Sequence, residues 1–406
     1  MDDILSRLIE GYMEIINKNA IRFCPICGNN KSEILHNQQF LIPSGIPLPD
    51  AYDVVCCATC HCVYADTPNT QQQYDEYYAF HSKYEHLSLS SEDDSRYTAT
   101  TNYLAHYLTN DSKILDIGCS NGGLLKKIRD RDCLHVTGID PSLSCIQHLA
   151  QQGIQGLACT LSDISSDSSR IGQHDFIILS HVMEHLVDPS AMMLAIKGLM
   201  NSKALVYIEV PDAANYRSHF KKPFHYFDVE HINHFDLDSL TNLAKQNGFR
   251  VIDSGRKILP VSDAVQFPAV YVVVQTDSES SSALIKCESL RHEMREYISL
   301  SLQAQDEGVI SQLASSQAPI ILWGVGSYAQ NLLKISPLRF CNIVDVVDRD
   351  PKKQGASIQN KIIKDPATLL DSNHPNATIL VASIPFATEI IKEIAAMGID
   401  NRVIVA

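Results

Sequence analysis

Hydrophobic positions in the middle of the chain occur as short apolar runs, separated by segments in which apolar residues recur at helical spacing. The apolar runs predict β-strands at 113–117, 135–139, 175–179 and 204–209. The segments between them predict helices near 122–129, 142–151 and 190–200. A helix near 237–247 and a strand near 249–254 complete this unit. The alternation of strands and helices predicts an α/β fold with a parallel, doubly wound sheet.

Smaller units are predicted at both ends of the chain. Residues 2–18 place apolar side chains at helical spacing, which predicts an amphipathic packing helix. A polar break at 277–283 precedes a helical stretch at 284–313. The last unit has predicted strands from Pro319, at 343–347, at 378–382 and at 402–405, and a helix at 386–396. We therefore predict an N-terminal module at 1–85, an α/β core at 86–275, a helical linker at 276–314 and a small α/β domain at 315–406.

Length and charge narrow the classes of protein that fit. A chain of 406 residues is too long for one hydrophobic core, in agreement with several domains. Its 33 basic and 47 acidic residues give a net charge of −14, which argues against a general nucleic-acid binder. No apolar run approaches the ~20 residues that a membrane-spanning helix requires. The acidic start Met1-Asp2-Asp3 also lacks a signal-peptide pattern, so we expect a cytoplasmic protein without a membrane partner.

Two C-x2-C pairs lie in the N-terminal module, Cys24 with Cys27 and Cys57 with Cys60. Each pair can place two thiolates on one metal ion through a tight turn, and two pairs complete a tetrahedral zinc site. The separation over 28–56 exceeds the usual spacing, so a loop must bulge between the pairs. Four thiolates leave no open coordination position, which predicts a structural zinc rather than a catalytic one.

The chain has 12 cysteines, and an intracellular location favours metal ligands and buried thiols over disulfides. Cys56 and Cys62 flank the second pair but fall outside the knuckle spacing. The alternative to a zinc site is a set of reduced, buried cysteines.

The most specific motif follows the first core strand and reads Ile114-Leu115-Asp116-Ile117-Gly118-Cys119-Ser120-Asn121-Gly122-Gly123. The next strand ends about twenty residues on, at Asp140. Glycine lets the backbone approach a ligand, and an acid at the end of the second strand can accept hydrogen bonds from both ribose hydroxyls. The turn has no lysine and no Walker pattern, so phosphate is not the expected ligand. This D-x-G-x-x-x-G turn resembles the cofactor loop of class I S-adenosylmethionine-dependent methyltransferases.

The resemblance implies S-adenosylmethionine as the cofactor. The candidate cofactor-binding residues are Asp116, Gly118, Cys119, Asn121, Gly122, Asp140, Leu161 in a later turn, and His181. In such methyltransferases the segment 175–189 forms the floor of the cofactor pocket. His181 comes at the carboxyl end of the third core strand, where ligands of open α/β sheets bind. His181 and His185 can alternatively be surface or supporting residues.

A second glycine-rich turn, Gly324-Val325-Gly326-Ser327-Tyr328-Ala329, opens the C-terminal unit. Asp348 follows 22 residues after Gly326, at the end of the next predicted strand. This G-x-G-x-x-A pattern is close to the dinucleotide fingerprint and by itself indicates NAD. A full dinucleotide site uses two βαβ halves, and this Rossmann-like unit has little more than one. We therefore expect it to bind no nicotinamide cofactor.

The order of these parts is more specific than any one of them. A paired C-x2-C module, a class I methyltransferase core and a short Rossmann-like unit resemble the three-domain sugar C-methyltransferases, which act on nucleotide-linked keto-deoxysugars. The likeness covers nearly the whole chain. It implies that the C-terminal unit contributes to a nucleotide-sugar site.

The segment Phe227-Asp228-Val229-Glu230-His231-Ile232-Asn233-His234-Phe235 looks like that family's H-E-H-L-x-Y-F stretch. The resemblance implies that Glu230 and His231 lie in the active site, with His231 as the base. This chain departs from the family at Val229, where the family has His, and at His234, where it has Tyr. Asp228 stands where a Tyr of the catalytic region is often found.

The segment 74–86 is rich in Tyr and His and joins the cysteine module to the core. It can cap a substrate pocket, in which case Tyr78 is a candidate catalytic residue. It can equally be a linker that packs through its aromatic rings.

The preferred function is methylation of a small molecule, a carbon of a nucleotide-linked keto sugar, with His231 as base. Methylation of a sugar or natural-product hydroxyl is the alternative, because the same base serves both reactions. An NAD-dependent enzyme that uses Gly324, Gly326 and Asp348 is a second alternative. A zinc protein that methylates nucleic acid is disfavoured by the net charge of −14 and by the lack of an Asn-Pro-Pro-Tyr-type motif.

Overall fold

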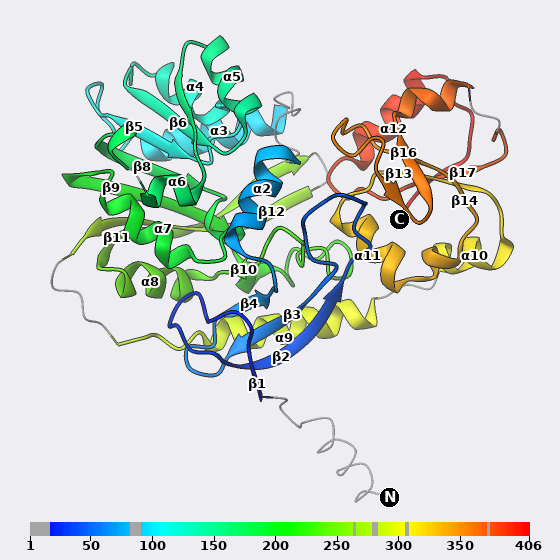
Figure 1. Ribbon diagram of the computed structural model, residues 1–406, viewed down its shortest axis with the longest axis horizontal. Helices are drawn as coiled ribbons and strands as arrows, with labels where there is room; N and C mark the ends of the chain where they lie inside the picture. Colours follow the sequence, from blue (N-terminus) through cyan, green and yellow to red (C-terminus); the bar gives the residue numbers. More distant parts are fainter. Residues whose placement is uncertain are drawn as a thin grey trace, which may run out of the picture.

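The computed structural model of this chain contains three β-sheets within the residues that it describes. It describes residues 17–81, 91–166, 168–262, 265–277, 283–304, 308–371 and 374–406. The largest sheet and its helices form the left side of the molecule in Figure 1, and the C-terminal sheet lies on the right. The N-terminal sheet lies below the large unit, next to a long helix.

The N-terminal sheet is antiparallel and has the strand order β1-β2-β3-β4-β10. Its strands are β1 (Asn17–Asn19), β2 (Lys31–Gln39), β3 (Ala51–Cys57), β4 (Val63–Asp66) and β10 (Asn233–His234). The predicted helix at 2–18 lies mostly outside the described residues. Its last two positions belong to β1 instead, because they pair with β2. The predicted bulging loop between the cysteine pairs is largely the hairpin of β2 and β3.

The last strand of this sheet comes from a distant part of the chain. β10 pairs with β4 through Asn233 opposite Tyr64 and His234 opposite Val63. Helix α2 (Gln71–Phe80) follows β4 and begins with a capping box at Thr70. The N-terminal sheet therefore holds the segment that immediately follows His231.

The second sheet has seven strands in the order β11-β12-β9-β8-β5-β6-β7. They are β5 (Ile114–Ile117), β6 (Val136–Asp140), β7 (Gln155–Ala158), β8 (His174–Ser180), β9 (Met200–Pro211), β11 (Phe249–Ser262) and β12 (Val265–Thr276). The strands from β9 to β7 are parallel, as predicted, whereas β12 runs antiparallel to both β9 and β11. The predicted strand at 249–254 extends to Ser262, and its hairpin partner β12 was not predicted.

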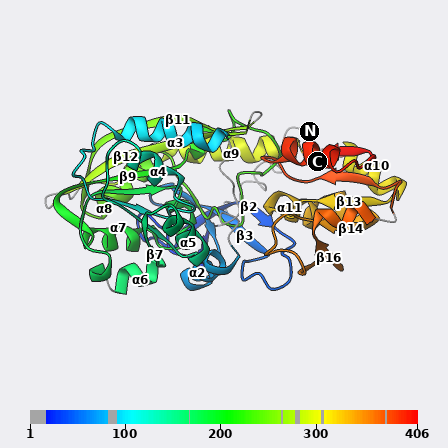
Figure 2. The same cartoon turned by 90° about the horizontal axis from the view of Figure 1, so that it is seen from above.

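Helices cover both faces of this sheet, so it is doubly wound as predicted. Helices α3 (Ser91–Leu104), α4 (Gly123–Arg129) and α5 (Leu143–Gln151) share one hydrophobic cluster with Ile178 of β8. Helices α6 (Leu161–Ser166), α7 (Pro189–Lys197) and α8 (Leu237–Gln246) share another with Ile177. Neighbouring residues of one strand point to opposite faces, as the pleat requires. Seen from above, α3 lies on one side of the sheet and α6 on the other (Figure 2).

One predicted site residue of this unit lies in an element other than the expected one. Leu161 was expected in a turn but is the first residue of α6, where its buried side chain packs in the core. Short 3-10 helices are formed by η2 (Ser168–Arg170), η3 (Met183–His185) and η4 (Ala213–Asn215).

The C-terminal sheet has the order β15-β16-β14-β13-β17-β18 and is parallel except for the pair β15 and β16. Its strands are β13 (Ile320–Trp323), β14 (Ile343–Val347), β15 (Ser357–Ile358), β16 (Lys361–Lys364), β17 (Thr378–Val381) and β18 (Val403–Val405). The other elements are α11 (Ser327–Ile335), η5 (Pro337–Phe340), η6 (Pro366–Asp371) and α12 (Ala387–Ala396). Hydrophobic clusters lie on both faces, which confirms a small α/β unit.

Two helices connect the large sheet to the C-terminal sheet. The single helical stretch predicted at 284–313 is divided into α9 (Glu288–Gln303) and α10 (Gly308–Ser316). Helix α9 lies against the N-terminal sheet (Figure 1), where Arg291 pairs with Glu33 of β2 at 3.1 Å. The helical linker thus also packs against the cysteine module.

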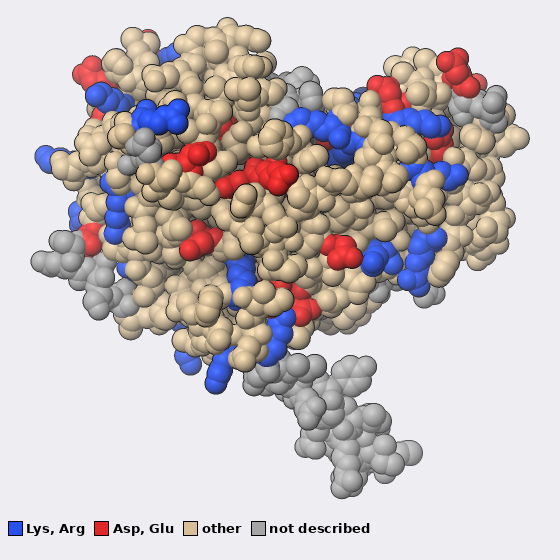
Figure 3. Space-filling view, viewed as in Figure 1, with Lys and Arg blue, Asp and Glu red and all other residues tan. Residues whose placement is uncertain are grey.

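The surface carries charges of both signs. On the face shown in Figure 3, basic and acidic side chains are interspersed over a larger neutral area. None of the helices that the structure describes is long and apolar enough to cross a lipid bilayer.

Candidate functional site

The order of the large sheet places its site-forming edge between β5 and β8. The chain leaves β5 toward β6 and β7 on one side and returns to β8 on the other. Loops at the carboxyl ends of two such strands diverge and leave a crevice for a ligand. The glycine-rich turn after β5 and the segment after β8 both lie at this position.

The backbone of the glycine-rich turn requires glycine at two positions. Gly118 has a φ of 75°, and a Cβ there would lie 2.6 Å from Cγ2 of Val182. Gly122 has a φ of 79°, and its Cβ would lie 2.8 Å from Cδ1 of Leu149. Between them Ser120 also adopts a left-handed conformation, with a φ of 50°. The turn is therefore a specialised backbone shape of the kind found at ligand sites.

The acid at the end of β6 joins this turn to the next helix. Oδ2 of Asp140 accepts a 2.9 Å hydrogen bond from the backbone N–H of Ser120. Its Oδ1 accepts a 2.9 Å bond from the N–H of Ser142, the N-cap of α5. Each carboxylate oxygen can accept a second hydrogen bond. Asp140 is thus oriented beside the glycine-rich turn, and its contact with a ribose stays a prediction.

Asp116 is the second carboxylate of this crevice and is almost completely buried. Burial, reinforced by the negative charge of Asp140, raises the pKa of Asp116 to about 8. A buried carboxyl in this condition is stabilised in its ionised form by a nearby cation. The crevice is therefore suited to a positively charged ligand.

The segment after β8 carries a histidine between two buried carboxylates. His181 has a φ of 58°, and its Nδ1 lies 3.0 Å from Oε1 of Glu184. Its Nε2 lies 3.7 Å from Oε1 of Glu209, at the end of β9. Glu209 is in turn paired with Lys257 at 2.9 Å and accepts a hydrogen bond from Tyr207. His181 thus lies at the carboxyl edge of the sheet with a buried carboxylate on each side.

Three polar groups gather next to His181. Glu184, His185 and His231 each place a ligand atom within 4.8 Å of the others. The rings of His185 and His231 have centroids 4.9 Å apart, and His185 Nε2 lies 4.0 Å from Glu184 Oε1. The residues come from segments that are more than forty positions apart in the chain. The fold therefore assembles a histidine and carboxylate cluster beside the predicted cofactor pocket.

The charges of this cluster are set by burial and by the histidines. Burial acts to raise the pKa of Glu184, but the hydrogen bond from His181 and the nearby charges of His185, His181 and His231 outweigh it. The pKa of Glu184 consequently lies below its ordinary value. Burial lowers the pKa of His185. The cluster thus combines an anionic carboxylate with an imidazole that favours its neutral form.

Helix α2 supplies two tyrosines to the same place. The hydroxyl of Tyr78 lies 2.8 Å from Nδ1 of His185. The hydroxyl of Tyr77 donates a 2.9 Å hydrogen bond to Oε1 of Glu230. The backbone carbonyl of Glu230 lies 3.0 Å from His185 Nδ1. The Tyr- and His-rich segment is therefore part of the site through α2, while its residues 82–86 lie outside the described ones.

The predicted residues divide into two groups by position. Asp116, Gly118, Asn121, Gly122 and Asp140 surround the first turn. Tyr78, His181, Glu230 and His231 lie in or beside the histidine cluster. The side chains of Cys119 and Leu161 are buried in the hydrophobic clusters on either side of the sheet, so they contribute chiefly to packing.

Sequence reasoning missed Glu184 as a site residue and left the role of His185 open. Both belong to the 3-10 helix η3, which begins three residues after β8 ends. Their signal was the run Ser180-His181-Val182-Met183-Glu184-His185 at the carboxyl end of a central strand. His234, in contrast, is completely buried on β10, and burial lowers its pKa to about 3. It is therefore a neutral core residue at physiological pH.

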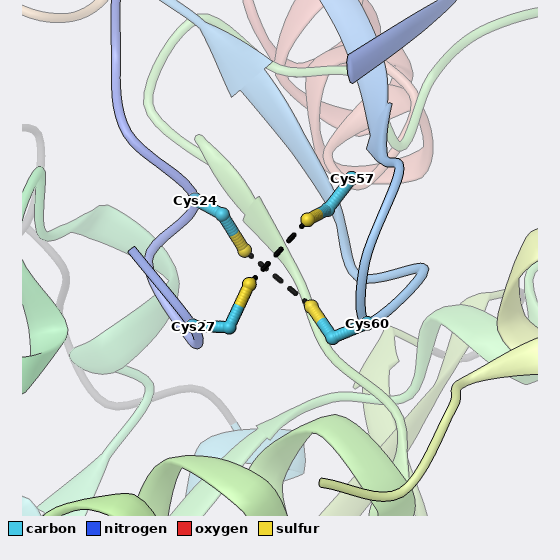
Figure 4. A group of neighbouring side chains, drawn as sticks. All are labelled: Cys24, Cys27, Cys57 and Cys60. Carbon is cyan, nitrogen blue, oxygen red and sulfur yellow. Dashed lines mark hydrogen bonds between the residues drawn. The ribbon is translucent and has the colours of Figure 1, made fainter. Parts of the chain in front are cut away.

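The four predicted metal ligands also come together. Figure 4 shows the thiols of Cys24, Cys27, Cys57 and Cys60 directed toward a common centre. The sulfur atoms of Cys24 and Cys60 are 3.5 Å apart, as are those of Cys27 and Cys57. Zinc–sulfur bonds of about 2.3 Å in a tetrahedron place the sulfurs about 3.8 Å apart. The donor set and its dimensions therefore fit zinc.

Known proteins resemble two parts of this chain. Residues 89–254 match the family model of a methyltransferase domain. Residues 316–405, the C-terminal α/β unit, match the model described as C2185-like, N-terminal.

Two curated relatives align with about a quarter of this chain. A ubiquinone biosynthesis O-methyltransferase of Aeromonas salmonicida is 32% identical over 100 residues, and one of Marinobacter nauticus is 24% identical over 102 residues. Each match covers 24% of this chain and only 42% of the relative's length.

Solved structures of methyltransferases are also similar. The 1,6-didemethyltoxoflavin-N1-methyltransferase of Burkholderia thailandensis, bound to S-adenosylhomocysteine, is 14% identical with a TM-score of 0.39, and the match covers 55% of this chain and 98% of that one. The magnesium protoporphyrin IX methyltransferase of Synechocystis is 14% identical with a TM-score of 0.36, over 46% of this chain and 84% of that one. The family match, taken with the glycine-rich turn and the doubly wound sheet, shows that the chain contains a class I S-adenosylmethionine-dependent methyltransferase domain.

Proposed function

We propose that this protein transfers the methyl group of S-adenosylmethionine to a carbon atom of a nucleotide-linked keto sugar, with His231 as the base. The observation that carries this proposal is the cluster of Glu184, His185 and His231 beside His181. It brings a candidate base to the same sheet edge as the predicted cofactor turn. Tyr78, which contacts His185, is a further polar group for the acceptor.

The chemistry requires a base next to an aligned methyl donor. His231 takes the proton from the carbon beside the sugar carbonyl, which leaves an enolate. The enolate carbon then bonds to the methyl group while the sulfur–methyl bond breaks and S-adenosylhomocysteine is released. Alignment of donor and acceptor can lower the barrier by about 7–11 kcal/mol, and a positioned base contributes roughly 10²–10⁴-fold. The Glu184 carboxylate stabilises positive charge that forms on the neighbouring imidazoles.

Contacts between the C-terminal unit and the loop before Glu230 support a role in holding the nucleotide end. The hydroxyl of Ser327, in the second glycine-rich turn, donates a 2.8 Å hydrogen bond to Oδ1 of Asp228. The same oxygen accepts a 2.8 Å bond from the N–H of Glu230. An acceptor that spans this junction would have its sugar at the histidines and its nucleotide at the second turn. Zinc would stabilise the cysteine module and take no part in the reaction.

The second candidate is methylation of a hydroxyl oxygen. The curated relatives are named as O-methyltransferases, and Asp228 and Val229 depart from the sugar C-methyltransferase pattern. A neutral imidazole can deprotonate a hydroxyl as well as an acidic carbon. The two reactions differ in whether a carbon–hydrogen bond breaks before methyl transfer.

Solvent deuterium distinguishes these reactions. The protein is incubated in D2O with S-adenosylhomocysteine and a panel of thymidine-diphosphate keto-deoxysugars, and the sugars are analysed by NMR. Carbon methylation predicts incorporation of deuterium next to the carbonyl without any methyl donor. A parallel incubation with S-adenosylmethionine should yield a product heavier by one methyl group. Methylated product without deuterium exchange would favour the oxygen acceptor, and no methyl transfer to any sugar would refute the sugar substrate.

A further inference from the structure

An arginine of the cysteine module contacts the two segments that carry the residues of the candidate active site. Arg22 precedes Cys24 by two residues, and only 6% of its surface is exposed. Its backbone N–H donates a 2.8 Å hydrogen bond to Oδ1 of Asp66, the last residue of β4. Its guanidinium group contacts the segment that follows β8 of the large sheet, so Arg22 links two units of the fold.

The guanidinium contacts the two segments that carry the histidine cluster. Nε and Nη2 donate to the carbonyl oxygen of Val187 at 2.9 and 2.6 Å, and Nη2 also lies 3.0 Å from the carbonyl oxygen of Leu186. These residues directly follow His185. On the other segment, Nη1 donates to the carbonyl oxygen of Ile232 at 3.0 Å and Nη2 to Oδ1 of Asn233 at 2.6 Å. These residues directly follow His231.

Further hydrogen bonds join the same two segments to each other. The side-chain amide of Asn233 donates to the carbonyl oxygens of Met183 and Leu186, both at 2.8 Å. The N–H of Ile232 donates to the carbonyl oxygen of Glu184 at 2.9 Å. Arg22 therefore completes a network that fixes the spacing of His185 and His231.

The chemistry of this network favours arginine specifically. A guanidinium is a planar fork of five donors and can serve several carbonyl oxygens at once. Loss of the side chain would remove the two donors that Arg22 supplies to the carbonyl oxygen of Val187, and a buried polar group without its donors is costly. The carbonyl oxygens of Leu186 and Ile232 would each keep one other donor. A lysine offers a single nitrogen and cannot reach both segments in the same geometry.

We propose that Arg22 is a positioning residue through which the cysteine module sets the geometry of His185 and His231. This inference rests on the proposed function for the roles of the two histidines. It gives the module a task in catalysis, although none of its four cysteines contacts the histidine cluster within the described part of the chain. A displacement of about 1 Å in a reacting group can lower the rate about 100-fold. The rate should therefore depend on a fixed spacing of His185 and His231.

The test compares Arg22→Met with Arg291→Met. Arg291 is the matched control, because it also joins the module to another element, through Glu33, but its described contacts lie away from both histidine segments. Arg22→Met should lower kcat about 100-fold while the Kd for S-adenosylmethionine stays within about twofold. Arg291→Met should leave kcat within about twofold. A kcat of Arg22→Met equal to that of the control would overturn the proposal.

Hydrogen–deuterium exchange provides a readout that needs no turnover. In Arg22→Met, exchange should accelerate in peptides that cover 183–188 and 230–235 and stay unchanged in β2. An increase spread evenly over the whole module would show a merely structural role and would reject the proposal. Because exchange does not depend on the acceptor, it decides the role of Arg22 even if no methyl transfer to a sugar is found.

Chemical rescue covers the case in which Arg22→Met does not fold. Arg22→Lys keeps the positive charge and should fold. Its kcat should fall about tenfold, because lysine lacks the planar set of N–H donors of the guanidinium group. Free guanidinium ion at a non-denaturing concentration should raise the kcat of Arg22→Ala and leave that of Arg291→Ala unchanged. An Arg22→Lys variant with a kcat equal to that of the wild-type protein would refute the proposal.

Discussion

The hydroxyl of Ser327 donates a 2.8 Å hydrogen bond to Oδ1 of Asp228, and so joins the C-terminal unit to the loop that carries Glu230 and His231. The carbonyl oxygen of Asp228 also accepts a 2.7 Å bond from the hydroxyl of Tyr52, on β3 of the cysteine module. The C-terminal unit and the cysteine module therefore both contact Asp228, in the segment that precedes β10. The loop next to the candidate base is held from both of the smaller units.

Loss of this contact should affect acceptor methylation more than cofactor binding. Ser327→Ala removes a hydrogen bond to a carboxylate, which typically contributes about 1.5–3 kcal/mol, and should lower kcat/KM for the acceptor about tenfold or more. The Kd for S-adenosylmethionine should stay unchanged, because Ser327 begins α11 of the C-terminal unit, whereas the cofactor turn follows β5 of the large sheet. Ser299→Ala, on the exposed part of α9, is the control. Steady-state kinetics and calorimetry together check the prediction, which fails if both parameters change equally.

Asp140 should be required for binding of the methyl donor. Asp140→Ala removes a charged acceptor for the ribose hydroxyls. It should weaken the binding of S-adenosylmethionine by about 1.5–3 kcal/mol, which raises the Kd tenfold or more. Asp348→Ala is the matched control, because Asp348 occupies the corresponding strand end of the C-terminal unit and accepts a 2.7 Å bond from the N–H of Val325. Its Kd should equal that of the unchanged chain. Stoichiometric NAD binding that is lost in Asp348→Ala would instead support a dinucleotide site.

Cofactor affinity should depend on pH through Asp116. Its pKa of about 8 in the folded chain means that the carboxyl is mainly protonated at pH 6, whereas the positive sulfonium favours the carboxylate. Binding should then release a proton, and affinity should rise between about pH 6 and pH 8.5. Calorimetry in buffers of different ionisation enthalpy measures this proton. Asp116→Asn should bind more weakly at high pH and lose the dependence.

The same raised pKa has a consequence for stability without the cofactor. A folded-state pKa above the unfolded value, which is about 3.9 for Asp, means that stability is present below the unfolded pKa and is lost as the pH rises through about 8. Asp116→Asn should therefore raise Tm at pH 8 by more than at pH 5. An equal change in Tm at both values would contradict the assignment.

The cysteine module should contain one zinc ion per chain. Cys57→Ser should lose the metal and destabilise the module, because structural zinc contributes directly to folding. Cys56→Ser is the control, since Cys56 is adjacent and equally buried but lies outside the group of four sulfurs. Mass spectrometry of the metal content and thermal unfolding check both variants. Freshly purified protein without zinc would show that the four thiols have another role.

His231 should act in the reaction and not in cofactor binding. His231→Asn should abolish turnover and deuterium exchange, a loss of at least about 100-fold, while the Kd for S-adenosylmethionine stays near that of the unchanged chain. His219→Asn is the control, because that ring lies in a loop against the carbonyl oxygen of Asn215. If His231→Asn keeps most of its activity, Tyr78 and His181 are the next groups to replace.

Local features of this protein were predictable from its sequence. The glycines at 118 and 122 have the left-handed backbone that their turn needs, and two C-x2-C pairs place four thiols together. The turn, and the arrangement of the two thiols within each pair, depend on neighbours within a few residues, because the conformation of a turn is determined by its own φ and ψ angles. The hairpin of β2 and β3 then brings the two pairs together. The apolar runs likewise gave strands β5, β6, β8 and β9 within a few residues of their true ends, since burial on both faces selects a continuous apolar segment.

The tertiary structure alone decided which distant groups meet. The direction of β12, the pairing of β10 with the cysteine module and the contact of Arg22 with Val187 and Ile232 all join segments far apart in the chain. The cluster of Glu184, His185 and His231 arises in the same way. A single sequence records the chemistry of each of these side chains but not their spacing, because that spacing is determined by how complete sheets and helices pack and by the need to pair every buried polar group.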